Sequence, residues 1–161
     1  MLDLGPACGS NIGFLAEQVR TLYLWDLLAA WDRLRGRGLP FAKLWEDLQV
    51  PVESVDGILF WDLIDHLDDG ELASLIATGR TLLRPRGMVL LLAGDRQSSS
   101  ETPQAFVLRE GFELMRRPRP QLSFPVHHRQ NRDILDRMSA FKLVKSFIYR
   151  NGLREYLFQL S

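Results

Sequence analysis

The sequence has few of the features that mark secreted, membrane or nucleic-acid-binding proteins. It contains one cysteine, Cys8, so no internal disulfide can form, which suits a reducing cytoplasm. Basic and acidic side chains number 20 each, so no bulk field attracts nucleic acid or an anionic membrane. The best apolar run, Met88 to Ala93, is too short to span a membrane, and the first residues show no basic region before an apolar stretch, as a secretory signal would. We expect a cytoplasmic protein with neither nucleic acid nor membrane as partner.

The chain is long enough for one domain with a core, because 46% of its 161 residues are hydrophobic. We therefore assign residues 1–161 to a single domain. No internal repeat or long linker interrupts it. Its least regular stretch, residues 95–129, gathers three consecutive serines and four prolines and is expected to be an insertion.

Strands and helices alternate along the sequence. Val55 to Trp61 and Met88 to Ala93 are apolar runs typical of strands covered on both faces. Between them, residues 68–83 have the apolar spacing of a helix, in which Gly79 indicates a close packing contact. Near the end, Asn151-Gly152 predicts a hairpin that adds an antiparallel strand. These patterns predict a doubly wound α/β fold with a mainly parallel sheet.

Four weaker elements complete this pattern. Residues 2–4 are a strand stump, residues 21–25 a short strand, and helices follow each of them. Phe41 to Gln49 is ambiguous between helix and strand, and we assign it as a weak strand. Arg129 to Ala140 is expected to be helical.

A glycine turn links the first strand to the first helix, with the pattern Asp3-x-Gly5-x-x-x-Gly9. Such a turn lets a ligand approach the backbone at the carboxyl edge of the sheet. A dinucleotide site needs G-x-G-x-x-G, and the carboxylate at the strand end would repel a phosphate. A cationic ligand would be attracted instead. The turn is also compatible with a purely connecting role.

At this point the sequence resembles the class I S-adenosylmethionine-dependent methyltransferases, whose first motif is D/E-x-G-x-G-x-G. Asp3, Gly5 and Gly9 match it, and Ala7 replaces the middle glycine. Asp26, after the second strand, matches the acid that accepts both ribose hydroxyls, and it also suits a helix N-cap. "VPVESVDGILFWDLIDHLDD" and "GRTLLRPRGMVLLL" resemble the fourth and fifth strand regions. The resemblance extends from Leu2 to the end of the final hairpin.

This resemblance implies a seven-stranded Rossmann-like methyltransferase sheet that binds S-adenosyl-L-methionine and methylates a small-molecule acceptor. Asp3, Gly5, Ala7, Gly9 and Asp26 would hold the cofactor. The segment 95–129 would face the acceptor, and its arginines and histidines are either an anion-binding surface or a solvated face. The two adjacent histidines have no further ligand at suitable spacing, so no metal site is expected.

Further candidates follow the strand that ends at Trp61. Phe60 and Trp61 are expected to pack against the cofactor or a flat acceptor, or to belong to the core. Asp62 and His66 are candidate catalytic residues, because either can take a proton from a hydroxyl or ammonium group. His66 is also compatible with a helix end or the surface, and Asp65 lies in the same short segment.

The sequence departs from the resemblance in two places. The acid that usually meets the adenine is replaced by Leu44, although Glu46 or Asp47 lies close by. The helices that usually precede the first strand are absent, so either the sequence starts late or the protein is a reduced form. We expect self-association or a partner that covers the exposed N-terminal edge. Two other functions are considered: a non-catalytic methyltransferase-like binding module, and a nicotinamide-dependent oxidoreductase, which the Asp3 spacing disfavours.

Overall fold

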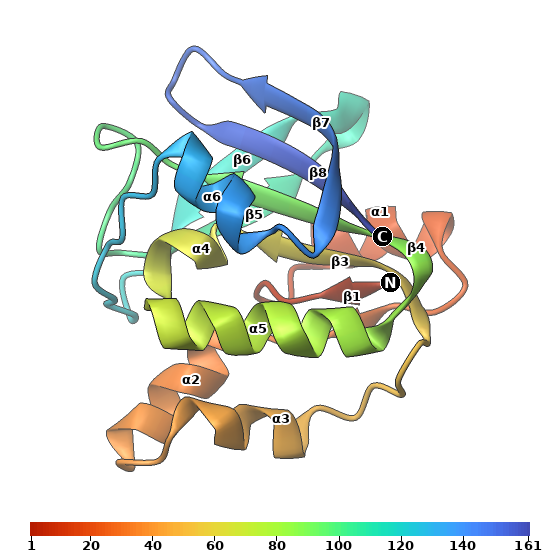
Figure 1. The fold of residues 1–161 in the computed structure, drawn as a ribbon. Coiled ribbons are helices and arrows are strands. Elements are labelled where there is room, and N and C mark those ends of the chain that lie inside the picture. Colours follow the sequence, from red (N-terminus) through yellow and green to blue (C-terminus); the bar gives the residue numbers. More distant parts are fainter.

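The computed structural model describes residues 1–161 and is built around a sheet of six strands in the order β2-β1-β3-β4-β8-β7 (Figure 1). β2, β1, β3 and β4 are mutually parallel, while β8 is antiparallel to both β4 and β7. The two remaining strands, β5 and β6, form a separate antiparallel hairpin. The strands are β1 Leu2–Asp3, β2 Tyr23–Leu24, β3 Val55–Trp61, β4 Leu83–Ala93, β5 Gln104–Leu108, β6 Leu114–Pro118, β7 Phe141–Ile148 and β8 Arg154–Leu160.

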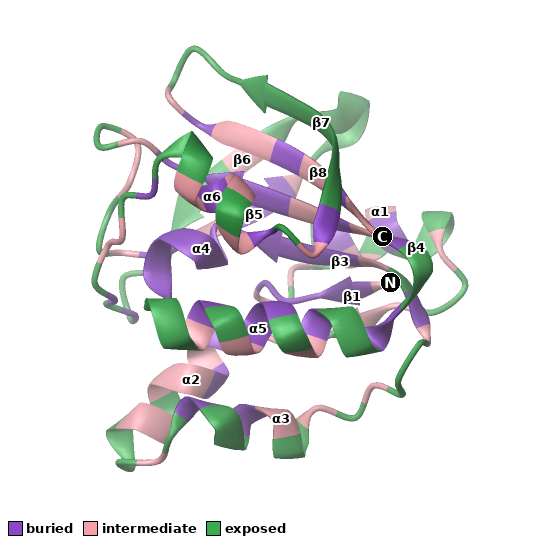
Figure 2. Ribbon diagram, viewed as in Figure 1, coloured by how far each residue is buried: buried purple, intermediate pink, exposed green.

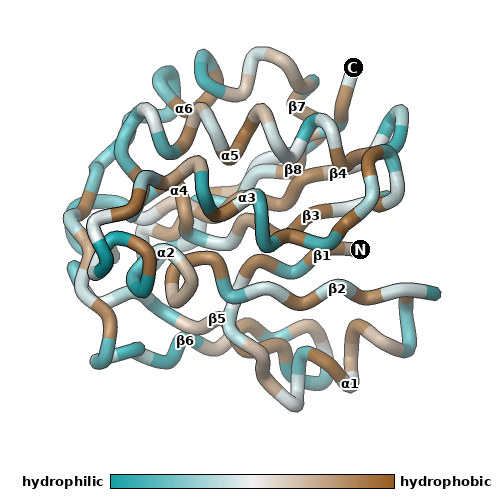
Figure 3. Tube along the Cα trace, turned by 90° about the horizontal axis from the view of Figure 1, so that it is seen from below, coloured by the Kyte–Doolittle hydropathy of each residue, from teal (hydrophilic) through white to brown (hydrophobic).

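Helices lie on both sides of the sheet, but the two sides are covered unequally. Seen edge-on, α5 and α6 lie on one side, while α1 and the β5–β6 hairpin lie on the other (Figure 3). A core cluster of 28 buried residues packs on the first side of the sheet, and a cluster of six packs on the second side. The helices are α1 Gly9–Gln18, α2 Leu27–Gly36, α3 Leu44–Asp47, α4 Leu63–His66, α5 Asp69–Leu82 and α6 Asn131–Arg137, with 3-10 turns at Phe41–Lys43 and Glu110–Phe112.

The well-covered side is organised by α5, whose buried residues face the sheet (Figure 2). A capping box begins this helix, because Asp68 accepts from the backbone of Glu71 and Glu71 accepts from the backbone of Asp68. Gly79 faces β3, where an added Cβ would lie 3.2 Å from Cζ of Phe60. The close contact predicted at this glycine is therefore present.

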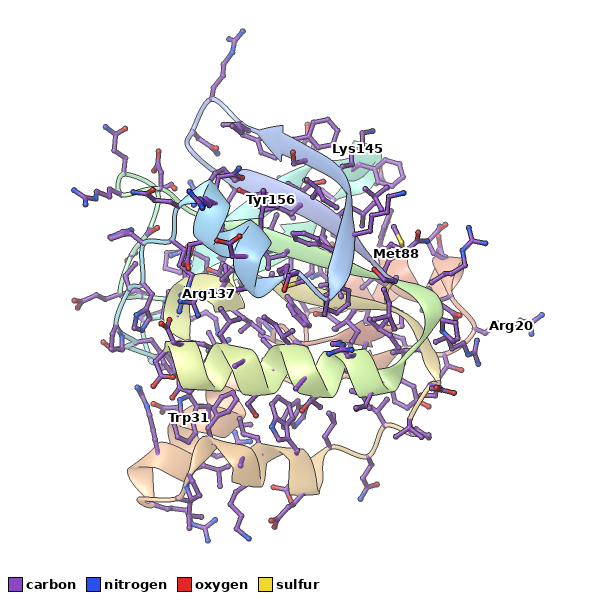
Figure 4. All side chains as sticks on the ribbon, in the orientation of Figure 1. Arg20, Trp31, Met88, Arg137, Lys145 and Tyr156 are labelled. Carbon is purple, nitrogen blue, oxygen red and sulfur yellow. The ribbon has the colours of Figure 1, made fainter.

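Aromatic and polar contacts attach the remaining elements to this side. Trp31 of α2 packs edge-on against Phe41, with ring centroids 5.2 Å apart (Figure 4). Tyr156 of β8 is buried and donates a hydrogen bond to Asn131 Oδ1 at the start of α6 (Figure 4). None of the helices is long and apolar enough to cross a membrane.

The predicted fold class is confirmed, including the hairpin that places β8 between β4 and β7. One element was predicted wrongly. Residues 41–47 are helical rather than a strand, so the sheet has six strands instead of seven. Phe41 and Leu44 are buried at a helical spacing of three, which a short apolar run does not distinguish from a strand. Leu44 thus belongs to the core and follows no strand.

Exposed apolar side chains gather on the edge strand β7 and near the turn of the β7–β8 hairpin. By contrast, β1 has a partner strand on each side, and Leu2 and Leu4 are buried. The exposed large apolar residues of β7 and the turn after it are Leu143, Val144, Phe147, Ile148 and Tyr149.

Candidate functional site

The glycine turn lies at the carboxyl edge of the sheet, where the chain order reverses direction. From β1 the chain passes to β2 on one side, and it then crosses to β3 on the other side. In open α/β sheets, ligands bind at this kind of switch point. The turn between Asp3 and Gly9 therefore occupies the position that the sequence pattern predicts.

Asp3 holds the turn from inside. Its side chain is buried, and its Oδ1 accepts hydrogen bonds from Gly5 N at 2.9 Å and from Trp61 Nε1 at 2.6 Å. Burial raises the pKa of this carboxyl, and the hydrogen bond from Trp61 opposes that shift. An added Cβ on Gly5 would lie 2.8 Å from Trp61 Nε1, so only glycine allows the indole this close. Asp3 and Gly5 thus hold Trp61 against the turn.

The rest of the turn is open. Ala7 and Gly9 are exposed at the start of α1, and an added Cβ on Gly9 would meet no atom within 4 Å. Cys8 precedes α1 without a side-chain cap. The structure therefore gives Gly5 a close contact and leaves Gly9 without one.

Asp26 lies at the end of β2 and has two kinds of partner. Its Oδ1 accepts from Ala29 N at 3.1 Å, which makes it the N-cap of α2. The guanidinium of Arg119 donates to both carboxylate oxygens, from Nη1 to Oδ1 at 3.1 Å and from Nη2 to Oδ2 at 2.5 Å. Asp26 therefore presents two oxygens side by side to a paired donor.

The two aromatic candidates point to opposite sides of the sheet. Phe60 is buried in the large core cluster beside Gly79, away from the turn. Trp61 stacks on Phe106 of β5, with ring centroids 5.5 Å apart and planes within 4°. Its backbone has φ of 50°, a left-handed conformation that is rare for a bulky residue, next to a register shift in β3. Local strain therefore accompanies the indole's position beside Gly5.

Asp62, Asp65 and His66 form a buried polar cluster just beyond β3. His66 Nε2 lies 3.3 Å from Asp62 Oδ2, and Asp65 Oδ2 accepts from Gly94 N at 2.6 Å. Asp65 Oδ1 and His66 Nδ1 are buried without a hydrogen-bonding partner. Burial raises the pKa of Asp65 to about 7. Asp65 can therefore exchange a proton near neutral pH, and it adds a group to the predicted pair.

The basic side chains of residues 95–129 do not form one surface. Arg119 is buried against Asp26, and Arg129 is buried against the carbonyls of Ile64 and Leu67. The others are exposed or half-buried, among them Arg116, Arg117, His127 and His128. Glu46, a possible partner for adenine, instead pairs with Lys43.

Three cavities adjoin this edge of the sheet, and Trp61 and Asp62 lie among their walls. The largest, about 480 Å³, is mainly apolar and lies between the sheet, α1 and the hairpin. A second, of about 10 Å³, adjoins Asp62, Asp65 and His66. The third, also about 10 Å³, lies beside Gly5 and Arg119.

The residue types here suit the cofactor implied by the resemblance, since Asp26 has two acceptor oxygens for ribose. The cavity beside Gly5 is too small for this cofactor when the side chains lie as described. A cavity of about 10 Å³ beside Gly5 holds about one water, whereas a nucleoside needs a far larger volume. Trp61, Phe106 and Arg119 fill the place that the cofactor would need.

Comparisons with known proteins place the fold. No protein-family model matches the chain, and no curated protein matches it. Among solved structures, an S-adenosylmethionine-dependent methyltransferase from Clostridium acetobutylicum gives a TM-score of 0.65 at 14% identity, over 99% of this chain and 83% of that one. A second structure is the 1,6-didemethyltoxoflavin-N1-methyltransferase from Burkholderia thailandensis, solved with 1,6-didemethyltoxoflavin and S-adenosylhomocysteine. It gives a TM-score of 0.60 at 18% identity, over 99% of this chain and 70% of that one. A methyltransferase from Mesorhizobium loti gives 0.63 at 14%, over 98% and 89%.

The chain therefore has the fold of the class I S-adenosylmethionine-dependent methyltransferases, as the sequence resemblance predicted. Sequence reasoning missed Arg119 as the partner of Asp26 and Asn11 as an anchor of the hairpin. No local pattern identifies either role, because each contact joins residues more than 90 positions apart.

Proposed function

We propose that the chain is an S-adenosylmethionine-dependent methyltransferase with a small-molecule acceptor. The observation that carries this proposal is the carboxylate of Asp26 at the switch point of a methyltransferase fold. Arg119 offers it two parallel donors, at 3.1 and 2.5 Å. Two vicinal ribose hydroxyls would also donate two hydrogen bonds to the two oxygens of a carboxylate. Asp26 thus has the position and the geometry for a ribose.

The glycine turn favours this cofactor over a dinucleotide. Asp3 lies buried directly beneath the turn, and its negative charge would oppose a pyrophosphate at the start of α1. A sulfonium carries positive charge and meets no such repulsion. A nicotinamide-dependent oxidoreductase is therefore the weaker assignment.

The cluster beyond β3 would serve the acceptor. The cofactor supplies a methyl group on a sulfonium, and the protein has to align an acceptor and receive its proton. Asp62 and His66 are 3.3 Å apart, so a proton taken by one can be shared with the other. The apolar cavity of about 480 Å³ on the far side of Trp61 has the size and lining of a small-molecule site.

One observation favours a second function, a non-catalytic module that keeps the fold. The place beside Gly5 is filled by the chain's own side chains, so a protein that never opens would bind no cofactor. The two functions differ in one measurable property, the affinity for S-adenosylhomocysteine.

Calorimetric titration with S-adenosylhomocysteine tests the proposal, with NADH as the competing ligand. Asp26→Asn is the matched variant, because asparagine also caps a helix but carries no charge. We expect S-adenosylhomocysteine to bind, NADH not to bind, and Asp26→Asn to weaken binding by roughly 1.5–3 kcal/mol. Binding of NADH alone would reassign the turn. Equal affinity in Asp26→Asn would leave Asp26 as a helix cap only.

A further inference from the structure

We propose that residues 104–119, the β5–β6 hairpin and the arginine after it, form a closed lid over the cofactor site. In this proposal the cofactor binds by replacing Arg119 on Asp26. The inference rests on the proposed function and adds a conformational step to it. The name "hairpin lid" is used below for residues 104–119.

The hairpin lid is a common wall of all three cavities at the carboxyl edge. Phe106 and Gln104 line both small cavities, beside the acid cluster and beside Gly5. Arg116 lines the acid-cluster cavity and the large apolar cavity. Movement of this one element would therefore join the glycine turn, the acid cluster and the apolar cavity into a single cleft. The segment from Leu59 to His66 also lines all three cavities, but it belongs to the sheet and to the helix after it.

Side-chain contacts, and no pairing with the main sheet, hold the hairpin lid in place. Its two strands pair only with each other and add no strand to the main sheet. Asn11 of α1 is its main polar anchor, with Nδ2 donating to Phe106 O and Oδ1 accepting from Leu108 N, both at 2.7 Å. The second strand is almost entirely exposed. Because the lid shares no strand pairing with the main sheet and its second strand is exposed, it can leave without unfolding the core.

The closed position brings the lid against the groups that a cofactor would need. Phe106 covers the indole of Trp61, which in turn covers Gly5. Arg119 takes both oxygens of Asp26. A ribose on Asp26 and a guanidinium on Asp26 exclude each other, because they use the same two acceptors. The closed lid is therefore a competitor of the cofactor.

Three variants separate the lid from the site. Arg119→Gln removes the ion pair, and Asn11→Ala removes the anchor on α1 without changing Asp26. Arg117→Gln is the matched control, since it removes the same charge from an exposed arginine two positions away. Amide hydrogen exchange of residues 104–119 in the free protein is the first measurement. We expect about tenfold faster exchange in Arg119→Gln and Asn11→Ala and no change in Arg117→Gln, as a less populated closed state requires. Unchanged protection in both lid variants would overturn the proposal without reference to any ligand.

Affinity for S-adenosylhomocysteine is the second measurement. Opening the lid removes a competing state, so Arg119→Gln and Asn11→Ala should each bind about tenfold more tightly than the wild type. Asp26→Asn should bind more weakly, although it breaks the same ion pair as Arg119→Gln. If Arg119 competes with the cofactor, the two variants change the affinity for S-adenosylhomocysteine in opposite directions. If the ion pair is only structural, both variants change it in the same direction. Weaker binding in both would overturn the lid.

The two proposals fail in different ways. If amide hydrogen exchange is faster in the lid variants but no form of the protein binds S-adenosylhomocysteine, the proposed function is wrong. The proposed replacement of Arg119 by the cofactor on Asp26 is then wrong as well. If the wild type binds tightly while residues 104–119 stay protected in the complex, the cofactor site stands and the lid alone is wrong.

Discussion

At the scale of single residues, the site depends on carboxylates whose surroundings differ. Asp26 is partly exposed and ion-paired, whereas Asp65 is 3% exposed and has one oxygen without a partner. Burial is the main cause that raises the pKa of Asp65 to about 7, and Asp62 adds to it, while Gly94 N, His66 and Arg154 oppose it. One residue type thus supplies both an ion-paired carboxylate and a group that titrates near neutrality.

Asp65 gives a prediction about pH. Its pKa in the folded protein lies above the value of about 3.9 in an unfolded chain, so the folded state binds the proton more strongly. The free energy of unfolding should therefore fall as pH rises from about 4 through about 7. Asp65→Asn keeps an acceptor for Gly94 N and removes this loss, so its stability relative to the wild type should rise by roughly 2–4 kcal/mol between pH 4 and pH 8. Urea unfolding at both pH values measures this, and a difference independent of pH would contradict it.

At the scale of elements, local patterns predicted the strands that carry strong signals. Val55–Trp61 was read as a buried strand because seven residues are nearly all apolar, and Asn151-Gly152 fixed the final hairpin. The helical turns at 41–47 were missed because their apolar residues are too few to show a period. The segment that contains the hairpin lid was expected as an insertion facing the acceptor, and its hairpin was not predicted, since its position depends on contacts with α1 and with the N-cap of α2 that the sequence does not display.

Gly79 of α5 gives a prediction at the same scale. Gly79→Val should lower the free energy of unfolding by about 1–3 kcal/mol, because a side chain there meets Phe60. Ala77→Val is the control, since it places a valine on the exposed face of the same helix, where only helix propensity changes. Chemical denaturation measures both. Helix propensity alone would make Gly79→Val slightly more stable than the wild type, so a variant without any loss would show that Gly79 has no packing role.

At the scale of the whole molecule, the exposed apolar surface lies on β7 rather than beside β1, where the sequence led us to expect it. β7 is an edge strand, and its Ile148 is 81% exposed. An edge with exposed apolar residues favours pairing with a second copy. We expect the protein to self-associate with rising concentration, and Ile148→Lys to keep it monomeric at an unchanged melting temperature. Light scattering after size exclusion measures this, and a wild type that stays monomeric would refute the expectation.

The central claim is that the glycine turn between β1 and α1 binds the cofactor. The indole N–H of Trp61 reports on cofactor binding directly, because it donates a hydrogen bond to Asp3 beside Gly5. The chain has only four tryptophans, so few indole signals are present. In a proton–nitrogen correlation spectrum, with Trp61→Phe identifying its signal, addition of S-adenosylhomocysteine should shift the Trp61 indole peak. The peaks of Trp31 and Trp45, which pack around Phe41, should not move. A Trp61 peak that stays in place under saturating ligand would contradict the account.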